Sequence, residues 1–183
     1  MPAPTPAHGI RLLLLADTHL PRRAKDLPDD VWAEVARADV VVHAGDWVDV
    51  ETLDRLEARS RSLLACWGNN DGPELRARLP EVARATIAGV RVAVVHETGS
   101  KDRRNERMRA AYPDTDLLVF GHSHIPWDTT HAGLRLLNPG SPTDRRQQPS
   151  CTWMTCRLAD GAVHDVVVHR LPRPQAGASA KRR

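Results

Sequence analysis

Residues 10–17 read IRLLLLAD, a short apolar run that ends in a carboxylate, and the pattern recurs along the chain. It returns as DVVVHAGD over residues 39–46 and as RSLLACWGNND over residues 61–71. Each run is too short for a helix and rich in aliphatic residues, as strands buried on both faces are. Residues 29–38 and 49–60, which lie between the runs, have helical spacing and begin with Asp. The first third of the chain therefore predicts a βαβαβ unit with a parallel sheet.

The rest of the chain predicts more strands and one helix. Residues 82–89 and 90–97 are typical of a hairpin, residues 101–113 of a charged helix, and residues 115–124 of another buried strand. Shorter strands separated by turn signals follow over residues 125–133, 134–141, 150–161 and 162–171. We expect an α/β core with an antiparallel second half, built as two packed sheets with helices outside.

Length and composition limit the class of protein. A chain of 183 residues with 41% hydrophobic residues predicts one soluble globular domain. Its three cysteines have no paired spacing, which argues against a disulfide framework and against a thiolate metal site. The N-terminal sequence MPAPTPAHGI has no positive charge before the apolar run, so we expect no secretory signal and a cytoplasmic protein.

The net charge of +3 has its origin at the C-terminus. Residues 170–183 carry five basic residues and no acidic one, which leaves 21 basic against 23 acidic residues over 1–169. We expect a flexible N-terminus over 1–9, a single domain over 10–169 and a disordered basic tail over 170–183. The slightly acidic body argues against a groove for nucleic acid.

Polar side chains follow the C-terminal ends of several predicted strands. They are Asp17, His19, Asp46, Asn69, His96, His122 and His124. Ligands collect beyond the carboxyl ends of the strands in open parallel sheets, so we expect these side chains to converge. Within GHSH, residues 121–124, two histidines one residue apart would face the same side of a strand and reach two adjacent metals, with Ser123 pointing away.

In order and approximate spacing, segments of this chain resemble the five motifs of the calcineurin-like metallophosphoesterases. These segments are DTH (17–19), GDWVD (45–49), GNND (68–71), a strand ending in VVH (94–96) and GHSH (121–124). NPGSPTDRR, residues 138–146, is similar to a signature of their small bacterial and archaeal phosphodiesterase branch. The resemblance extends from about Arg11 to Val168. It implies a four-layer αββα sandwich, with two mixed β-sheets flanked by helices, and a metal-dependent phosphoesterase, above all a phosphodiesterase.

The resemblance also implies a centre of two divalent metal ions. The first ion would be bound by Asp17, His19, Asp46 and His124, and the second by Asp46, Asn69, His96 and His122, with Asp46 bridging. Two such ions can hold a hydroxide for in-line attack on phosphorus and can neutralise the phosphoryl charge. Asp46, His19 and Asn70 would have the catalytic roles. Imidazole, carboxylate and amide ligands suit Mn, Fe, Zn, Ni or Co, and manganese is the metal that the resemblance suggests.

Two positions depart from the family pattern. Asn70 stands where many relatives have a histidine that donates a proton. Its amide can hydrogen-bond a phosphoryl oxygen but cannot act as a general acid, so we expect aryl phosphodiesters to be better substrates than alkyl monoesters. Glu97 stands where the family has Gly, and its carboxylate would narrow the site or repel an anionic substrate.

Other residues have structural interpretations. Asp49 is predicted to cap a helix, with a position close to the metal ligands as the alternative. His43 reads as a core residue or as a partner of a ligand, and NPGS over 138–141 as a type II turn. Arg103 is a candidate contact for a substrate phosphate, although a solvated helix face is favoured for its basic run. Trp67 would line the cleft or simply pack beside it.

Several functions share this pattern. The alternatives are a non-catalytic metal-binding or protein-interaction scaffold, such as the retromer subunit that resembles these enzymes, and a phosphomonoesterase or nuclease with the same site. The presence of all seven ligands argues against the scaffold. We expect a small phosphodiester or other phosphorylated substrate, no membrane partner and no specific nucleic acid. The sequence leaves the natural substrate and a possible homodimer open.

Overall fold

The structure is a computed structural model that describes residues 9–172 of the chain. The N-terminal segment expected over 1–9 and the basic tail expected over 170–183 lie almost entirely outside the described residues. Arg170, the first residue of that expected tail, is the last residue of a strand. No helix within residues 9–172 is long and apolar enough to span a bilayer.

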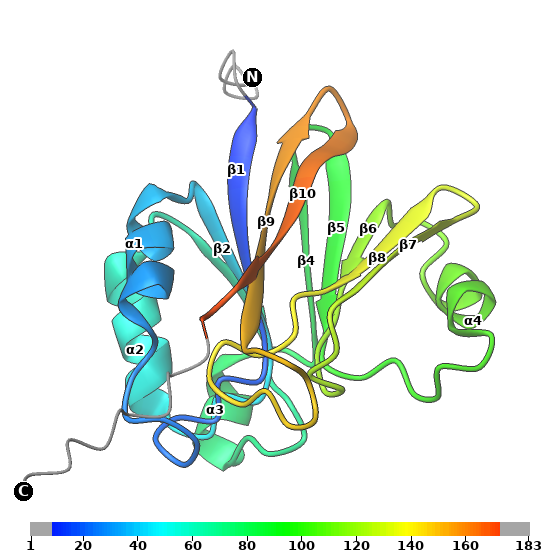
Figure 1. The fold of residues 1–183 in the computed structure, drawn as a ribbon. Coiled ribbons are helices and arrows are strands. Elements are labelled where there is room, and N and C mark those ends of the chain that lie inside the picture. The colour runs from blue at the N-terminus through cyan, green and yellow to red at the C-terminus, as the bar shows by residue number, and fades with distance from the viewer. Residues whose placement is uncertain (1–8, 173–183) are drawn as a thin grey trace, which may run out of the picture.

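The first sheet contains the predicted βαβαβ unit (Figure 1). Its strand order is β10-β9-β1-β2-β3. The strands are β1 (Ile10–Leu15), β2 (Val40–Ala44), β3 (Leu63–Cys66), β9 (Thr152–Ala159) and β10 (Ala162–Arg170). Strands β1, β2 and β3 pair in parallel, and β9 joins the other edge of β1 antiparallel. The last hairpin of the chain therefore returns to the first sheet.

The second sheet has the order β4-β5-β6-β8-β7. Its strands are β4 (Val82–Ile87), β5 (Val90–Val95), β6 (Leu117–Val119), β7 (Trp127–His131) and β8 (Leu134–Asn138). The predicted antiparallel arrangement is correct for the two hairpins, β4–β5 and β7–β8, but β6 pairs in parallel with both β5 and β8. Turn residues indicate hairpins, whereas pairing between non-consecutive strands has no local signal. Both sheets are mixed, which confirms the fold that the resemblance implied.

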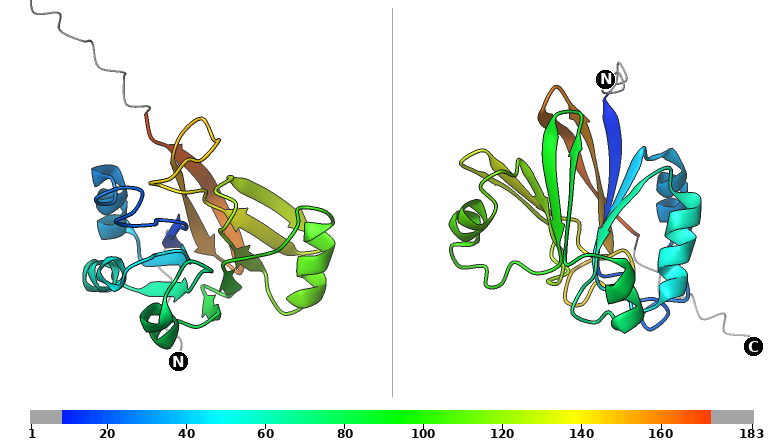
Figure 2. Two further views of the ribbon diagram at one scale, coloured as in Figure 1. Left: turned by 90° about the horizontal axis from the view of Figure 1, so that it is seen from below. Right: turned by 180° about the vertical axis from the view of Figure 1, so that it is seen from behind.

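Helices cover the outer faces of the two sheets. Helices α1 (Asp29–Arg37) and α2 (Val50–Arg59) lie on the first sheet, and α4 (Arg104–Ala111) lies on the far side of the second (Figures 1 and 2). The helix α3 (Pro73–Arg78) was not predicted. It is only six residues long, and its signal is a proline in its first turn after Gly72.

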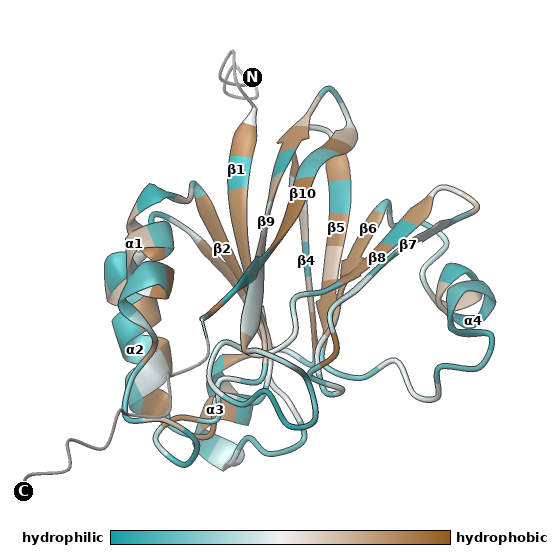
Figure 3. Ribbon diagram, viewed as in Figure 1, coloured by the Kyte–Doolittle hydropathy of each residue, from teal (hydrophilic) through white to brown (hydrophobic). Residues whose placement is uncertain are grey.

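Three apolar layers explain the composition of the strands. Leu12 and Leu14 lie in the core between the two sheets, whereas Leu13 and Leu15 pack beneath the helices of the first sheet. Successive side chains of a strand point to opposite faces, so a strand buried on both faces needs an unbroken apolar run. A third core, which includes Leu118 and Met108, lies between the second sheet and α4. Figure 3 shows apolar residues along the strands and polar residues in the loops below them.

Candidate metal centre

The loops that follow β1, β2, β3, β5 and β6 meet at the lower end of the sandwich in Figure 1. These loops carry all the predicted ligands, which come from both sheets. Their backbone is unusual, because five of the ligands have positive φ: Asp17, His19, Asp46, His122 and His124. Such conformations are uncommon outside glycine and concentrate at functional sites.

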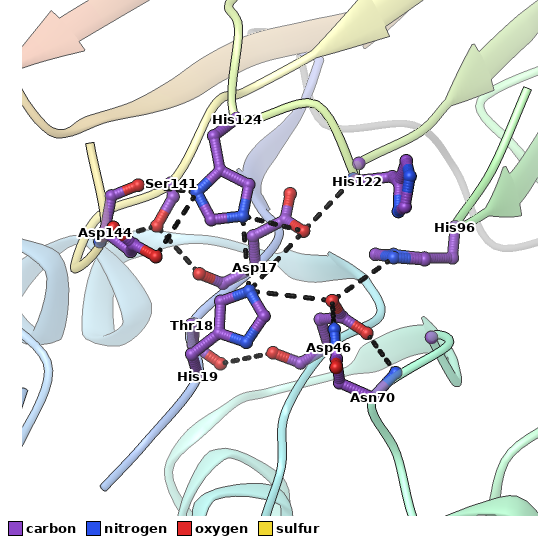
Figure 4. Close-up of polar contacts among 12 residues, drawn as sticks. Asp17, Thr18, His19, Asp46, Asn70, His96, His122, His124, Ser141 and Asp144 are labelled. Atoms are coloured by element: carbon purple, nitrogen blue, oxygen red, sulfur yellow. Dashed lines mark hydrogen bonds and ion pairs between the residues drawn. The ribbon is translucent and has the colours of Figure 1, made fainter. Parts of the chain in front are cut away.

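The two histidines of GHSH are not on a strand, because β6 ends at Val119. With φ of 69° at His122 and 58° at His124, the explanation from strand alternation is wrong. The turn nevertheless sends the two rings to different parts of the cluster (Figure 4). His124 stacks against His19 with ring centroids 5.1 Å apart, and His122 meets His96 edge-on at 5.2 Å.

The first group of donors surrounds His124. The Nε2 atoms of His19 and His124 are 3.2 Å apart, and the Oδ1 atom of Asp17 is 3.4 Å from His124 Nε2. Ligand atoms of Asp17, His19 and His124 all lie within 4.8 Å of one another. All three residues are buried, with His19 the most exposed at 7%. This group has the size and the donor atoms of a site for a divalent cation.

The second group surrounds His96. Asn69 Oδ1 lies 2.9 Å from His96 Nε2 and 3.0 Å from His122 Nδ1. Asp46 connects this group to the first, because its Oδ2 atom is 3.4 Å from His96 Nε2 and 3.5 Å from His19 Nε2. The structure therefore brings together every predicted ligand, with the Asp46 carboxylate between the two groups.

Backbone carbonyls orient the imidazoles. The Nδ1 atom of His96 hydrogen-bonds the carbonyl of Ala44 at 2.8 Å, and that of His124 hydrogen-bonds the carbonyl of Asp144 at 2.6 Å. In both rings this contact leaves Nε2 directed into the cluster. A histidine that binds a metal needs such a partner on its other nitrogen.

Burial and charge crowding set the protonation of the metal-free cluster. Burial raises the pKa of Asp17 to about 8 and lowers the pKa of His124 to about 4. Burial alone would lower the pKa of His96, but its contacts with Asp46 and Asp17 raise it to about 9. In the metal-free protein the proton on His96 thus balances carboxylate charge that a bound cation would otherwise balance.

The residues present fit a metal ion. Asp17 Oδ2 is buried and has no hydrogen-bond partner among residues 9–172. Leaving a buried carboxylate oxygen unpaired is costly, and a cation would satisfy it. Neutral imidazole at His124, directed by its Asp144 contact, supplies a free lone pair 3.4 Å from the other oxygen of the same carboxyl group, Asp17 Oδ1. Hard oxygen donors mixed with imidazole suit the first-row divalent metals named above.

Asn70 lies at the exposed edge of the cluster. Its backbone N–H donates to Asp46 Oδ1 at 2.8 Å, and its side-chain amide donates to Asp46 Oδ2 at 2.6 Å. These bonds and the contact with His96 outweigh burial and hold the pKa of Asp46 below its ordinary value. The amide is thus at the site, and in the metal-free protein it holds the central carboxylate.

Asp71 and the NPGS segment hold the ligand loops in place. Asp71 accepts hydrogen bonds from the backbone N–H groups of Gly68, Asp46 and Val48, at 2.7, 3.0 and 2.8 Å. In the NPGS segment, Ser141 Oγ donates to the carbonyl of Asp17 at 2.7 Å and accepts from Asp144 N–H at 2.8 Å. Gly140 has a positive φ of 75°, which the third position of a type II turn requires, and the segment fixes two loops of the cluster.

The remaining candidates lie away from the donors. Asp49 caps α2 by accepting from Thr52 N–H at 2.9 Å. His43 is buried, stacks on Trp47 and contacts Thr18 Oγ1 at 3.2 Å. Arg103 is not brought to the cluster; it is the N-cap residue of α4 and lines a separate pocket with Lys101 and Trp127.

Two charged residues lie beside the cluster: Arg146, for which the sequence predicts no role, and Glu97, which is expected to narrow the site. Arg146 is exposed and donates from Nη1 to the carbonyl of His122 at 3.0 Å. Arg146 is the last residue of NPGSPTDRR, the segment that resembles a family signature, but this resemblance assigned no role to the residue. Glu97 extends the second group, because its Oε1 atom lies 3.6 Å from His122 Nδ1. Ligand atoms of His96, Glu97 and His122 lie within 4.8 Å of one another, so Glu97 is a further possible ligand.

Sequence comparison agrees with the motifs. The pattern of the calcineurin-like phosphoesterase superfamily domain matches residues 10–161. A probable metallophosphoesterase of Methanocaldococcus jannaschii is 36% identical over 131 residues, which cover 71% of this chain and 67% of that protein. A probable metallophosphoesterase of Methanothermobacter thermautotrophicus is 30% identical over 166 residues, or 88% of this chain and 92% of that protein.

Solved structures have the same fold. A Thermotoga maritima protein has a TM-score of 0.70 at 31% identity, covering 88% of this chain and 99% of its own. Vps29 of Chaetomium thermophilum has a TM-score of 0.73 at 18% identity, covering 88% and 97%. Vps29 of Entamoeba histolytica, solved in complex with Zn²⁺, has a TM-score of 0.70 at 21% identity, covering 88% and 98%. The two Vps29 structures show the likeness of fold alone.

Proposed function

The chain belongs to the calcineurin-like phosphoesterase superfamily, and we propose that it is a metal-dependent phosphodiesterase with a dinuclear centre. One observation carries the proposal: donors from both sheets form two groups, and the Asp46 carboxylate lies within 3.5 Å of a histidine from each. In the proposal Asp46 bridges the ions, and manganese is the metal we expect. When bound, the ions would supply the nucleophilic water at neutral pH and neutralise the phosphoryl oxygens.

Three side chains of the site would have further roles in the reaction. Asn70, with its amide at the exposed edge, would donate a hydrogen bond to a non-bridging phosphoryl oxygen. Arg146 would add positive charge on the opposite rim, since its charge already lowers the pKa of Asp17 and His124. His19, whose pKa is lowered by burial, would stay neutral and so keep its Nε2 lone pair available to the first ion. Arg103 has no part in this proposal.

The leaving group must depart without a histidine that donates a proton. Asn70 occupies the edge of the site, and its amide cannot protonate an alkoxide. Diesters with acidic leaving groups, such as aryl esters, are therefore the proposed substrates, and alkyl monoesters are poor ones. A small diester also agrees with the nearly balanced charge of the body. We propose no nucleic acid as substrate, and we extend the proposal to a cytoplasmic location and a homodimer.

The test is hydrolysis of bis(p-nitrophenyl) phosphate beside p-nitrophenyl phosphate, by metal-stripped protein with and without added Mn²⁺. We expect metal-dependent cleavage of the diester, a slower reaction of the monoester, and a loss of at least about 100-fold in Asp46→Asn. Asp54→Asn, on the exposed face of α2, removes a carboxylate elsewhere and should retain activity. Folded protein without activity for any of the divalent metals would overturn the proposal and favour the non-catalytic scaffold.

A further inference from the structure

A pocket of about 250 Å³ opens beside the second group of donors. Two of its lining residues, Asn69 and His96, are themselves predicted metal ligands. The remaining walls combine aliphatic, aromatic and acidic side chains: Trp67, Glu81, Val82, Val95, Glu97 and Tyr112. A group attached to a phosphate held at the metal centre would therefore enter this pocket.

Two acidic side chains, Glu81 and Glu97, line the pocket. Within residues 9–172, neither Glu81 nor Glu97 forms an ion pair with a lysine or arginine, and the ion-pair contact of Glu97 is His122, 3.6 Å away. Both glutamates are exposed at the pocket. An anionic substituent would be repelled here, and a neutral one would gain nothing from the carboxylates.

The aromatic walls already bind cations in the structure. The guanidinium of Arg76 lies 4.1 Å from the Trp67 ring centroid, and that of Arg84 lies 5.2 Å from the Tyr112 ring centroid. Neither arginine lines the pocket. Aromatic rings combined with carboxylates form the usual environment for ammonium and quaternary ammonium groups.

We propose that this pocket, formed by Trp67, Tyr112, Glu81 and Glu97, selects phosphodiesters in which one ester group carries an ammonium or quaternary ammonium. The inference rests on the proposed phosphodiesterase function and names its substrate class. Glu81 is the main anionic wall, because Glu97 also lies within reach of the second group of donors.

The probe substrate is p-nitrophenyl phosphorylcholine, compared with bis(p-nitrophenyl) phosphate. In its hydrolysis water adds to phosphorus, the bond from phosphorus to the phenolic oxygen breaks, and p-nitrophenolate leaves with the electron pair. One proton of the attacking water goes to solvent, and the other stays on the new P–OH group of the product phosphorylcholine. We expect a higher kcat/KM for the choline ester in the wild-type protein.

The variants isolate the pocket. Glu81→Gln and Tyr112→Leu should each lower the ratio of kcat/KM, choline ester over bis(p-nitrophenyl) ester, by about tenfold. Glu51→Gln removes an exposed carboxylate from α2 and should leave the ratio unchanged. As a readout without catalysis, tetramethylammonium binding to metal-stripped full-length protein is followed by saturation-transfer NMR, and the signal should weaken in Glu81→Gln.

The outcomes separate the two proposals. If the neutral diester is hydrolysed but the ratio is one or less, or is unchanged in Glu81→Gln, the pocket assignment is overturned and the phosphodiesterase proposal stands. If neither diester is hydrolysed, the phosphodiesterase proposal fails. In that case tetramethylammonium binding still tests the assignment of the pocket. Binding that is weaker in Glu81→Gln supports a cation site, and no binding overturns it.

Discussion

Asp46 is the residue at which the two groups of donors meet. Its position follows from sequence, since it comes two residues after Ala44, the last residue of a buried strand, and Gly45 between them has a positive φ of 82°. A Cβ on Gly45 would lie 2.8 Å from the backbone of Gly68, so only glycine allows the β2 and β3 loops to approach each other. That approach brings Asn70 to the Asp46 carboxylate.

Replacing Asn70 tests its part in leaving-group chemistry. Asn70→His should raise the hydrolysis of alkyl esters relative to aryl esters by about 10- to 100-fold, because an imidazolium can protonate an alkoxide. The measurement is kcat/KM for a matched pair of ethyl and p-nitrophenyl phosphodiesters with Mn²⁺. Asn70→Ala serves as the control, since it removes the same bond to Asp46 without adding an acid. An unchanged ratio in Asn70→His would contradict the assignment of Asn70 to the leaving-group side.

At the residue level, sequence could identify the ligands but not their local geometry. Donors at strand ends are visible because strands end where apolar runs end. The left-handed backbone of His122 and His124 has no such signal, and strand alternation gave the wrong reason for placing them together. Arg146 reaches the cluster only because its loop folds back onto the His122 carbonyl, a contact between residues 24 apart.

At the level of secondary structure, the NPGS segment, residues 138–141, connects β8 to the loops that carry the predicted ligands. Gly140 has φ of 75°, and a Cβ there would collide with Thr152 Oγ1. Gly140→Ala should lower the free energy of unfolding by about 2 kcal/mol or more. It should also weaken Mn²⁺ binding, because Ser141 would lose its hydrogen bond to the Asp17 carbonyl.

The matched control is Gly133→Ala, which has a similar φ of 82° but open space around the added Cβ. It should cost only the backbone strain, about 1 kcal/mol, and leave metal affinity unchanged. Urea denaturation and Mn²⁺ titration of both variants provide the comparison. Equal losses of unfolding free energy and of Mn²⁺ affinity in the two variants would mean that the NPGS segment does not support the site.

A partly buried ion pair attaches α1 to the first strand. Glu34 is 9% exposed and accepts from Arg11 Nη2 at 2.6 Å. Burial would raise the pKa of Glu34, but the bonds from Arg11 and Arg37 outweigh it, so the pKa falls below the ordinary value of 4.5. Glu34→Gln should therefore cost about 2 kcal/mol of unfolding free energy near neutral pH.

The pH dependence of this cost has a definite sign. Because the folded state favours ionised Glu34, its stabilisation is complete above pH 4.5 and is lost as the pH falls through the lower folded-state pKa. Urea denaturation of both proteins from about pH 7 to about pH 3 should show the difference closing in acid. Glu57→Gln, which breaks an exposed pair with Arg78, should cost less than about 1 kcal/mol. A cost for Glu34→Gln that does not change with pH would refute the ionic contribution.

Elements were predictable where their signals are local. The helices α1 and α2 have apolar spacing within their own sequence, and the strands have apolar runs or turn residues at their ends. The helix α4 has no apolar periodicity and no side-chain cap, and only its charged composition predicted it. The helix α3 has one turn and a half, too few residues for a periodic pattern, although Pro73 marks its start. The parallel pairing of β6 with β5 and β8 is set by packing across the sandwich, which no short segment records.

For the whole molecule, the cluster joins two sheets that pack against each other through an apolar core. Asp17, Asp46 and Asn69 follow strands of the first sheet, whereas His96, His122 and His124 follow strands of the second. A bound cation would therefore cross-link the two halves of the sandwich, because Asp17 and His124 belong to one donor group and Asp46 and His96 to the other. Metal binding is then coupled to the stability of the complete fold.

Thermal unfolding measures that coupling. Mn²⁺ at about 100 times its Kd should add about 2.7 kcal/mol, which for a chain of this size raises Tm by about 5–10 °C. Chelator should reverse the shift. Asp17→Asn alters a loop of the first sheet and His96→Ala a loop of the second, and each should abolish most of the shift if the ions span both sheets. If the shift is lost in only one of these variants, the metal is held by the loops of a single sheet, and the cross-link between sheets is wrong. Far-UV circular dichroism of each metal-free variant shows that loss of the shift is not loss of the fold.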